Sequence, residues 1–422
     1  MANGKGRIAF FGTVSICLCA LALLDNYDTV RVDEVIITSD FGHSCNPAEW
    51  PEYDINLDVP AKDRWTHIIQ DIFGKYGMDP FKSFTDTIKT KYERGPAEIF
   101  VSTNDLDNIL QGRVSSFSAD DLEEMRGIAQ TLAALSGQPV EEITRNVVLS
   151  QFLYEEANNA GIYKIGALGS VNKACTSAIV NTRDGKVIHS RNMDWPLFDG
   201  MPNLRARIRF SRGGSLVFQG NFYVPWIGTI TGQRYGAYSI DLHQRDQLSY
   251  GHDGDVLACS TCPLKMTDRL AAGYSPDGLA IRHALEQQAS FNVVVTSLEN
   301  VSLLTPCYFD ISGLVPGDGA IVARGLVAHK SRRMTDIAGT WYLVQANYDW
   351  WQSVGANDGR DTNLARLIED VGVASLDANT LFGLMRHNGV VQGDTDQTDI
   401  MCAAQNKFKS TFYLTSNCSG AQ

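Results

Sequence analysis

Basic residues are the minority charge class in this sequence, since 36 Lys and Arg stand against 48 Asp and Glu, a formal net charge of −12. A chain with this balance lacks the cationic surface that neutralises phosphates, so we expect no nucleic-acid binding. The sequence also lacks internal repeats and low-complexity tracts. Its 422 residues are 44% hydrophobic, which is ample for a large core in one α/β unit or in two or three domains.

Long apolar runs are scarce. The one candidate is the stretch 8–24, which follows Lys5 and Arg7. A positive start, a short apolar stretch and a small residue such as Ala22 are typical of a secretory signal peptide. We therefore predict that residues 1–22 are a signal peptide, that the mature chain has no stable membrane span, and that it is lysosomal or secreted. An uncleaved membrane anchor is the weaker alternative.

Cysteine is present in an odd number outside that stretch, because two of the nine cysteines lie within it and seven remain. In an oxidising compartment at least one thiol is then unpaired. Cys259 and Cys262 have C-x-x-C spacing without a second pair, so we expect a local disulfide. The histidines show no metal-ligand spacing, and we predict neither a metal nor a cofactor. Asn300 is expected to carry a glycan in preference to Asn417.

The pattern of the chain changes at residue 175. Before it, Ser118 is expected to cap a helix over 119–135, and Pro139 to open another that runs to about residue 157. After it, short apolar runs typical of strands predominate, and helical patterns return later. This order predicts a layered α+β architecture. The expected strands are 175–181, 186–193, 215–220, 235–241, 307–312, 319–325 and 340–347, and the expected helices are 276–289, 361–371 and 376–387.

The segment from Cys175 to Asp194 predicts a β-hairpin, because Asp184-Gly185 lies between two apolar runs. With that dipeptide as the loop, Cys175 and Asp194 are cross-strand partners, with Cβ atoms about 4.5–5.5 Å apart. Arg191 then faces the other side unless a bulge turns it. The residues alone leave two interpretations open: a cysteine nucleophile beside a carboxylate, or a buried hairpin with a core cysteine and a surface ion pair.

Several motifs resemble those of one enzyme family, and they occur in the family's order. The chain is similar in them to acid ceramidase and N-acylethanolamine acid amidase, which are N-terminal-nucleophile hydrolases of the cholylglycine hydrolase group. The motifs are Ile55-Asn-Leu-Asp-Val-Pro60 with Arg64-Trp65, Lys173-Ala-Cys-Thr-Ser177, His189-Ser-Arg-Asn-Met-Asp-Trp-Pro196, Ile227-Gly-Thr-Ile-Thr-Gly-Gln-Arg234, and Val344-Gln-Ala-Asn-Tyr-Asp-Trp-Trp351 followed by Arg360.

The resemblance implies a four-layer αββα sandwich and a chain that cuts itself between Ala174 and Cys175. Residues 23–174 would then form a helical α-subunit that stays associated with the catalytic β-subunit, residues 175–422. The implied substrate is a lipid amide, and a lipid-presenting activator protein is a further candidate partner.

The resemblance also assigns roles to individual residues. Cys175 is the nucleophile for autocleavage and for amide hydrolysis, Arg191 and Asp194 flank it, Asn347 offers its amide to the oxyanion, and Arg360 lies nearby. The chemistry is coherent, because an N-terminal cysteine carries its own base, an α-amine with a pKa of about 7.7–8.0. Arg191 would favour the thiolate and Asp194 would orient the amine. A donor such as Asn347 typically contributes about 2.7–4 kcal/mol.

Two positions depart from the family pattern. Gln244 stands before Arg245 where the family usually carries Glu. Because Gln244 cannot ionise, any proton control by that carboxylate is lost or moved, for example to His243, and this position gives no basis for expecting an acidic pH optimum. Asp361 stands where relatives commonly place a second Arg.

Ceramide and N-acylethanolamine are the leading substrates, and we favour ceramide slightly. Met193 agrees with the ceramidase motif, whereas Trp195-Pro196 is closer to the ethanolamide enzyme. Trp195 and Trp226 are the aromatic residues most expected to line an acyl-chain channel, although a core role is the alternative. A bile-salt or penicillin-type acylase is disfavoured by the long N-terminal portion. A non-catalytic secreted lipid-binding relative is disfavoured because the five predicted catalytic residues are all present.

Overall fold

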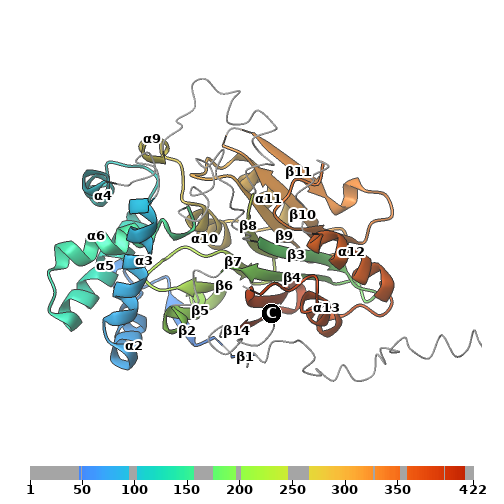
Figure 1. Ribbon diagram of the computed structural model, residues 1–422, viewed down its shortest axis with the longest axis horizontal. Coiled ribbons are helices and arrows are strands. Elements are labelled where there is room, and N and C mark those ends of the chain that lie inside the picture. Colours follow the sequence, from blue (N-terminus) through green and yellow to red (C-terminus); the bar gives the residue numbers. More distant parts are fainter. Residues whose placement is uncertain are drawn as a thin grey trace, which may run out of the picture. The chain divides into compact units, whose positions relative to one another are not determined.

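Two β-sheets lie face to face in the computed structural model (Figure 1). All residues that the structure describes fall within one unit, residues 39–422. The described residues are 47–48, 50–94, 102–155, 174–195, 201–245, 266–326, 328–351, 359–393 and 395–413. The predicted signal peptide and the Cys259–Cys262 disulfide lie outside these ranges.

The strands of both sheets are antiparallel, except that β2 runs parallel to β5. The first sheet has six strands in the order β1 (Pro47–Ala48), β14 (Lys407–Tyr413), β13 (Thr395–Cys402), β4 (Val187–Asp194), β3 (Ala174–Asn181) and β12 (Tyr342–Gln345). The second has eight in the order β11 (His329–Arg333), β10 (Gly319–Arg324), β9 (Cys307–Ser312), β8 (Tyr238–Gln244), β7 (Thr231–Arg234), β6 (Ser215–Tyr223), β5 (Arg205–Arg212) and β2 (Glu52–Asn56).

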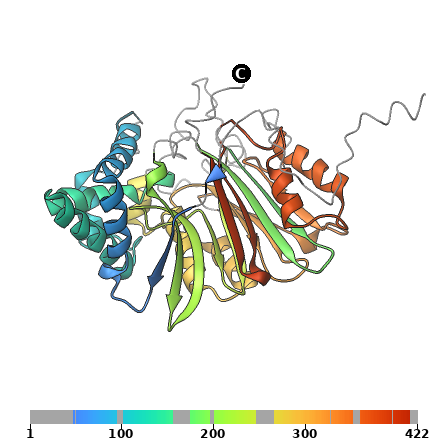
Figure 2. The ribbon, with the colours of Figure 1, turned by 90° about the horizontal axis from the view of Figure 1, so that it is seen from below.

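Helices cover the outer face of each sheet. On the first sheet, Val180 and Ile188 pack under α12 (Arg360–Val371) and α13 (Ala378–Met385), which lie on one side of the strands in Figures 1 and 2. The intervening residues Ile179 and Val187 point to the opposite face and pack between the sheets. On the second sheet lie α10 (Asp277–Gln287) and α11 (Phe291–Asn300). The predicted four-layer αββα architecture is confirmed.

A group of N-terminal helices packs beside this sandwich. The helix α5 begins as predicted, because the Ser118 side chain accepts a hydrogen bond from the N–H of Asp121 and the Asp121 carboxylate accepts one from the N–H of Ser118. These helices are α2 (Thr66–Tyr76), α3 (Asp79–Arg94), α4 (Thr103–Leu110), α5 (Ala119–Ser136) and α6 (Val140–Ser150), and a further short helix, α9 (Met266–Ala271), follows later in the chain.

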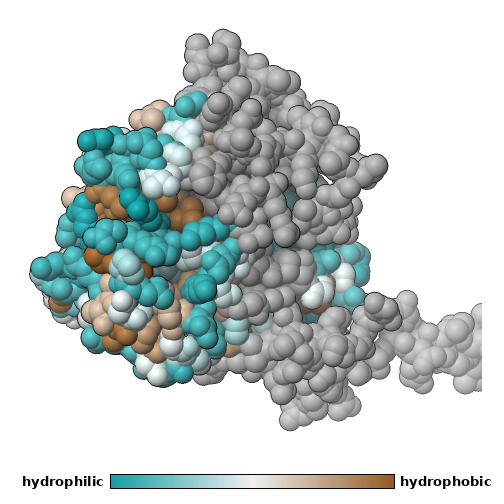
Figure 3. Space-filling model, turned by 60° about the vertical axis from the view of Figure 1, so that its left-hand side comes forward, coloured by the Kyte–Doolittle hydropathy of each residue, from teal (hydrophilic) through white to brown (hydrophobic). Residues whose placement is uncertain are grey.

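The surface of the N-terminal helices is mixed in polarity. Hydrophilic side chains predominate in Figure 3, with apolar patches between them. A groove of about 300 Å³ is lined by residues of α3, α5 and α6, among them Phe81, Leu132 and Val147. Within the described ranges, no helix combines the length and apolar character needed to cross a bilayer.

Candidate active site

The hairpin that carries Cys175 has a register one residue away from the predicted one. Cys175 pairs with Met193, and Ala174 pairs with Asp194. The reason lies in the turn. Gly185 has a positive φ of 76°, whereas Asp184 does not, so the two residues do not form the type I′ turn that a two-residue loop requires. The N–H of Gly185 instead bonds to the Thr182 carbonyl at 3.1 Å, and the loop includes one more residue.

The corrected register changes which side chains share a face. Arg191 pairs with Ser177, two residues from Cys175, so Arg191 and Cys175 point to the same face without a bulge. Asp194 points to the opposite face, at the end of its strand. The expectation that Asp194 stands beside the thiol was therefore wrong.

The Cys175 thiol is buried, with 8% of the residue exposed. Its Sγ accepts a hydrogen bond from Nη2 of Arg191 at 3.1 Å. The backbone N–H of Cys175 donates to Oδ1 of Asn347 at 2.8 Å. Burial raises the pKa of the thiol, and the positive charge and hydrogen bond of Arg191 oppose part of that rise. The sulfur and the backbone nitrogen of the predicted nucleophile therefore each have a defined polar partner.

Arg191 is held in place by the second sheet. Its guanidinium donates to the carbonyls of Ile230 and Leu242, each at 3.1 Å, and to the Thr231 hydroxyl. Although burial lowers the pKa of Arg191, the neighbouring Cys175 thiol raises it above the ordinary value, so the side chain stays charged. Thr231 belongs to the family-like motif at 227–234, but its contact with Arg191 was not predicted.

Arg360, at the start of α12, connects the remaining predicted residues. Its Nη1 lies 2.9 Å from Oδ2 of Asp194 and donates to the Cys175 carbonyl at 3.0 Å. Its Nη2 donates to Oδ1 of Asn347 at 3.1 Å. The Asn347 amide nitrogen donates to the Gln244 carbonyl at 2.6 Å. The structure thus brings all five predicted catalytic residues into one contiguous set of contacts.

The two predicted substrate-contacting tryptophans are buried. Trp226 is 0% exposed and packs closely against Gly228 and Gly278. Trp195 is 6% exposed and makes an edge-on contact with Tyr154, with ring centroids 5.8 Å apart. In this structure both side chains therefore have the packing of core residues.

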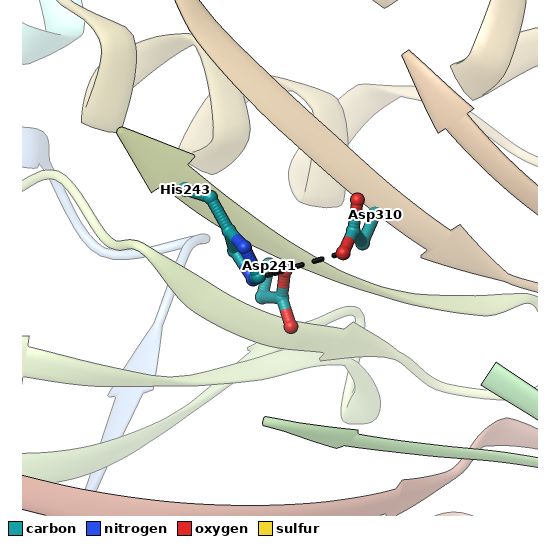
Figure 4. A group of neighbouring side chains, drawn as sticks. All are labelled: Asp241, His243 and Asp310. Atoms are coloured by element: carbon teal, nitrogen blue, oxygen red, sulfur yellow. Dashed lines mark ion pairs between the residues drawn. The ribbon is translucent and has the colours of Figure 1, made fainter. Parts of the chain in front are cut away.

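A second buried polar cluster lies between the sheets, on β8 and β9. Figure 4 shows Asp241, His243 and Asp310 pointing toward one another. On the neighbouring hairpin, His189 bonds through its ring nitrogens to the hydroxyls of Ser177 at 3.0 Å and of Ser239 at 3.2 Å. No motif or spacing in the sequence signals this cluster, because its members come from two separate strands.

Asp349, two residues after Asn347 in the same motif, is buried and fully engaged in hydrogen bonds. Its carboxylate accepts two hydrogen bonds from Arg245, at 2.8 and 2.7 Å, and one from the Tyr308 hydroxyl at 2.7 Å. These contacts give Asp349 a structural hydrogen-bonding role.

No family model matches the chain, but comparison with known proteins finds several similar to it. The chain is 27% identical over 322 residues to the N-acylethanolamine-hydrolyzing acid amidase of Caenorhabditis elegans, covering 75% of this chain and 79% of that protein. It is 25% identical over 399 residues to the acid ceramidase of Mus musculus, covering 88% and 90%. A solved structure of an ortholog of the amidase, also from Caenorhabditis elegans, matches 55% of this chain and 93% of that one, with 23% identity and a TM-score of 0.45.

Proposed function

The chain belongs to the family that contains N-acylethanolamine-hydrolyzing acid amidase and acid ceramidase, and we propose that it is a lipid amidase whose nucleophile is Cys175. One observation carries the proposal. The Cys175 sulfur lies 3.1 Å from a charged Arg191, while the nitrogen of the same residue lies 2.8 Å from Asn347. A residue that must use both its sulfur and its nitrogen needs such a pair of partners.

The first step in the proposed mechanism is self-cleavage. The Cys175 thiol attacks the carbonyl carbon of Ala174, and the peptide nitrogen leaves with a proton to become the free α-amine. Water then hydrolyses the resulting thioester and releases the carboxylate of Ala174. Until this happens the nitrogen of Cys175 is an amide, so the thiol cannot use it as a general base.

After the cut, the α-amine takes the thiol proton and the thiolate attacks the carbonyl of the lipid amide. Arg191 favours the thiolate, and a hydrogen of the Asn347 amide that is not bonded to Gln244 is available to the oxyanion. Collapse of the tetrahedral intermediate expels the amine product, which takes its proton from the α-ammonium. Water then attacks the acyl-thioester, with the α-amine as base, and releases the fatty acid.

Arg360 has a positioning role in this proposal. It bonds to the carbonyl of Cys175, to Asp194 and to Asn347, and therefore fixes the first residue of the new subunit relative to the oxyanion donor. Asp194 acts through Arg360, whose charge it balances. This differs from a direct bond between Asp194 and the α-amine.

The two fragments would remain together after the cut, because buried polar contacts join them. Glu124 on α5 bonds to Arg282 on α10, and Glu155 accepts a hydrogen bond from the N–H of Asp277 at 2.6 Å. We also propose that the chain is lysosomal or secreted and that a lipid-presenting activator protein is its partner.

The test uses the full chain after incubation at acidic pH, with a ceramide and an N-acylethanolamine as alternative substrates. We expect one of the two amides to be hydrolysed, and Cys175→Ser to abolish turnover. A matched control is Cys402→Ser, since Cys402 is also a buried free thiol but lies outside the site; this variant should retain activity. Loss of activity in both variants, or in neither, would contradict the assignment of Cys175.

A further inference from the structure

The buried cluster on β8 and β9 has the form of a metal site. Asp241 and His243 are two residues apart on β8 and therefore share a face, and Asp310 is the direct cross-strand partner of Asp241 on β9. The three residues are 0%, 0% and 1% exposed. Figure 4 shows their side chains converging between the sheets.

The polar atoms that converge there do not satisfy one another. Nε2 of His243 lies 3.1 Å from Oδ1 of Asp241 and 3.7 Å from Oδ2 of Asp310. Yet among the described residues, His243 Nε2, Asp241 Oδ1 and Asp310 Oδ1 have no hydrogen-bond partner. A buried polar atom without a partner is costly. Something that accepts lone pairs from all three residues would remove that cost.

The tautomer of His243 explains why its Nε2 cannot donate a hydrogen bond to the two carboxylates. Its Nδ1 lies 3.3 Å from the Ala346 carbonyl, which can only accept, so Nδ1 carries the hydrogen. In the neutral ring Nε2 is then a lone pair that faces two carboxylates.

We propose that Asp241, His243 and Asp310 bind one divalent metal ion of the zinc type. One imidazole nitrogen and carboxylate oxygens are donors that zinc accepts, and two carboxylates balance the charge of the ion. Two ligand atoms at about 2.1 Å from a tetrahedral ion are about 3.4 Å apart. The distances from His243 Nε2 to Asp241 Oδ1 and to Asp310 Oδ2, 3.1 and 3.7 Å, lie on either side of this value.

Further contacts orient the ligands in the manner of metal sites. The Ala346 carbonyl accepts from the far nitrogen of His243, and the Ser177 hydroxyl donates to Oδ2 of Asp241 at 3.0 Å. Hydrogen bonds of this kind fix the orientation of metal ligands. The cluster therefore has both candidate metal ligands and hydrogen bonds that hold those ligands in place.

The ion would have a structural role next to the candidate active site. Leu242, between the two β8 ligands, uses its carbonyl to hold Arg191, and Ala346 directly precedes Asn347. An ion on His243 would fix both segments. This inference does not depend on self-cleavage or on the substrate.

The experiment measures metal in the full chain, purified without chelators or metal-affinity resin. We expect about one equivalent of a divalent transition metal per chain by elemental analysis, a lower melting temperature after chelation, and recovery when Zn²⁺ is restored. Asp310→Asn should lose at least nine tenths of the bound ion. Asp277→Asn, which alters a buried carboxylate outside the cluster, should keep it.

Two results would overturn the proposal. One is a chelated wild-type chain that takes up no Zn²⁺ at micromolar concentration and melts at an unchanged temperature; the cluster would then hold a proton. The other is equal Zn²⁺ content in the two variants, which would place the ion elsewhere. The wild-type arm decides the question even if Asp310→Asn does not fold.

Discussion

Glu124 is the central residue of a buried ionic cluster, and its replacement by glutamine is a sharp test of what joins the N-terminal helices to the sandwich. The carboxylate is 1% exposed. It accepts from Arg64 at 2.9 Å, from the Trp65 indole at 2.7 Å and from Arg282 at 3.1 Å. Glu124→Gln keeps the size of the side chain but removes the negative charge between two buried guanidinium groups.

The expected cost follows from that arrangement. Removal of one partner from a buried ion pair leaves an uncompensated charge, at about 3–5 kcal/mol. Glutamine retains one acceptor oxygen, so we expect the lower end, about 3 kcal/mol in the free energy of unfolding. Urea unfolding followed by tryptophan fluorescence measures the loss, and Trp65 reports on the site directly.

Glu123→Gln is the matched control, because it makes the same substitution at the preceding position of the same helix. Glu123 pairs with Arg126 at the surface, with side chains 45% and 38% exposed. Such a pair contributes about 0–1 kcal/mol. Equal losses in the two variants, within about 1 kcal/mol, would refute the claim that the buried cluster joins the two parts.

Three further predictions follow from individual contacts. Burial raises the pKa of Asp277 to about 7 from 3.8, so the folded chain holds an extra proton between these values. The free energy of unfolding should therefore fall, by at most about 4 kcal/mol, as pH rises from about 4 to 7, and denaturant titrations of Asp277→Asn should lack this slope. Gly127→Ala should lower the melting temperature, because the added Cβ would lie 1.7 Å from the Lys62 carbonyl oxygen, whereas Gly74→Ala, with nothing within 4 Å, should raise it slightly. Arg191→Lys keeps a charge but loses the forked donor, and kcat on the lipid amide should fall about 10- to 100-fold, with unchanged kcat contradicting the role of Arg191.

Many helices and strands could be predicted from the sequence, because local residue patterns determine where they form. The strand predicted at 307–312 is β9 with the same bounds, and the helix predicted at 361–371 is α12, which begins one residue earlier. The cap at Ser118 follows from side-chain chemistry alone. The ends of helices that depend on tertiary packing were predicted less exactly. The helix expected to reach about residue 157 is α6, which ends at Ser150.

The residues of the candidate active site could be predicted from the sequence, but their relative orientation could not. Its residues could be named from motifs, yet the orientation of Arg191 depends on the register of a single turn. A shift of one residue moves every side chain to the other face of a strand. Asp184-Gly185 fits either of two turn types, and only the tertiary structure selects between them. The pairing of Asp241 with Asp310 depends on which strands become neighbours, and no local pattern encodes that.

The central claim is that Cys175 becomes an N-terminal residue and thereby gains its own base. The most direct measurement is the intact mass and N-terminal sequence of the protein after incubation at acidic pH, taken together with its activity. We predict two fragments, one of which begins Cys-Thr-Ser-Ala, and amide hydrolysis that rises in proportion to that fragment. Full activity in a chain whose Ala174–Cys175 bond is still intact would contradict the account.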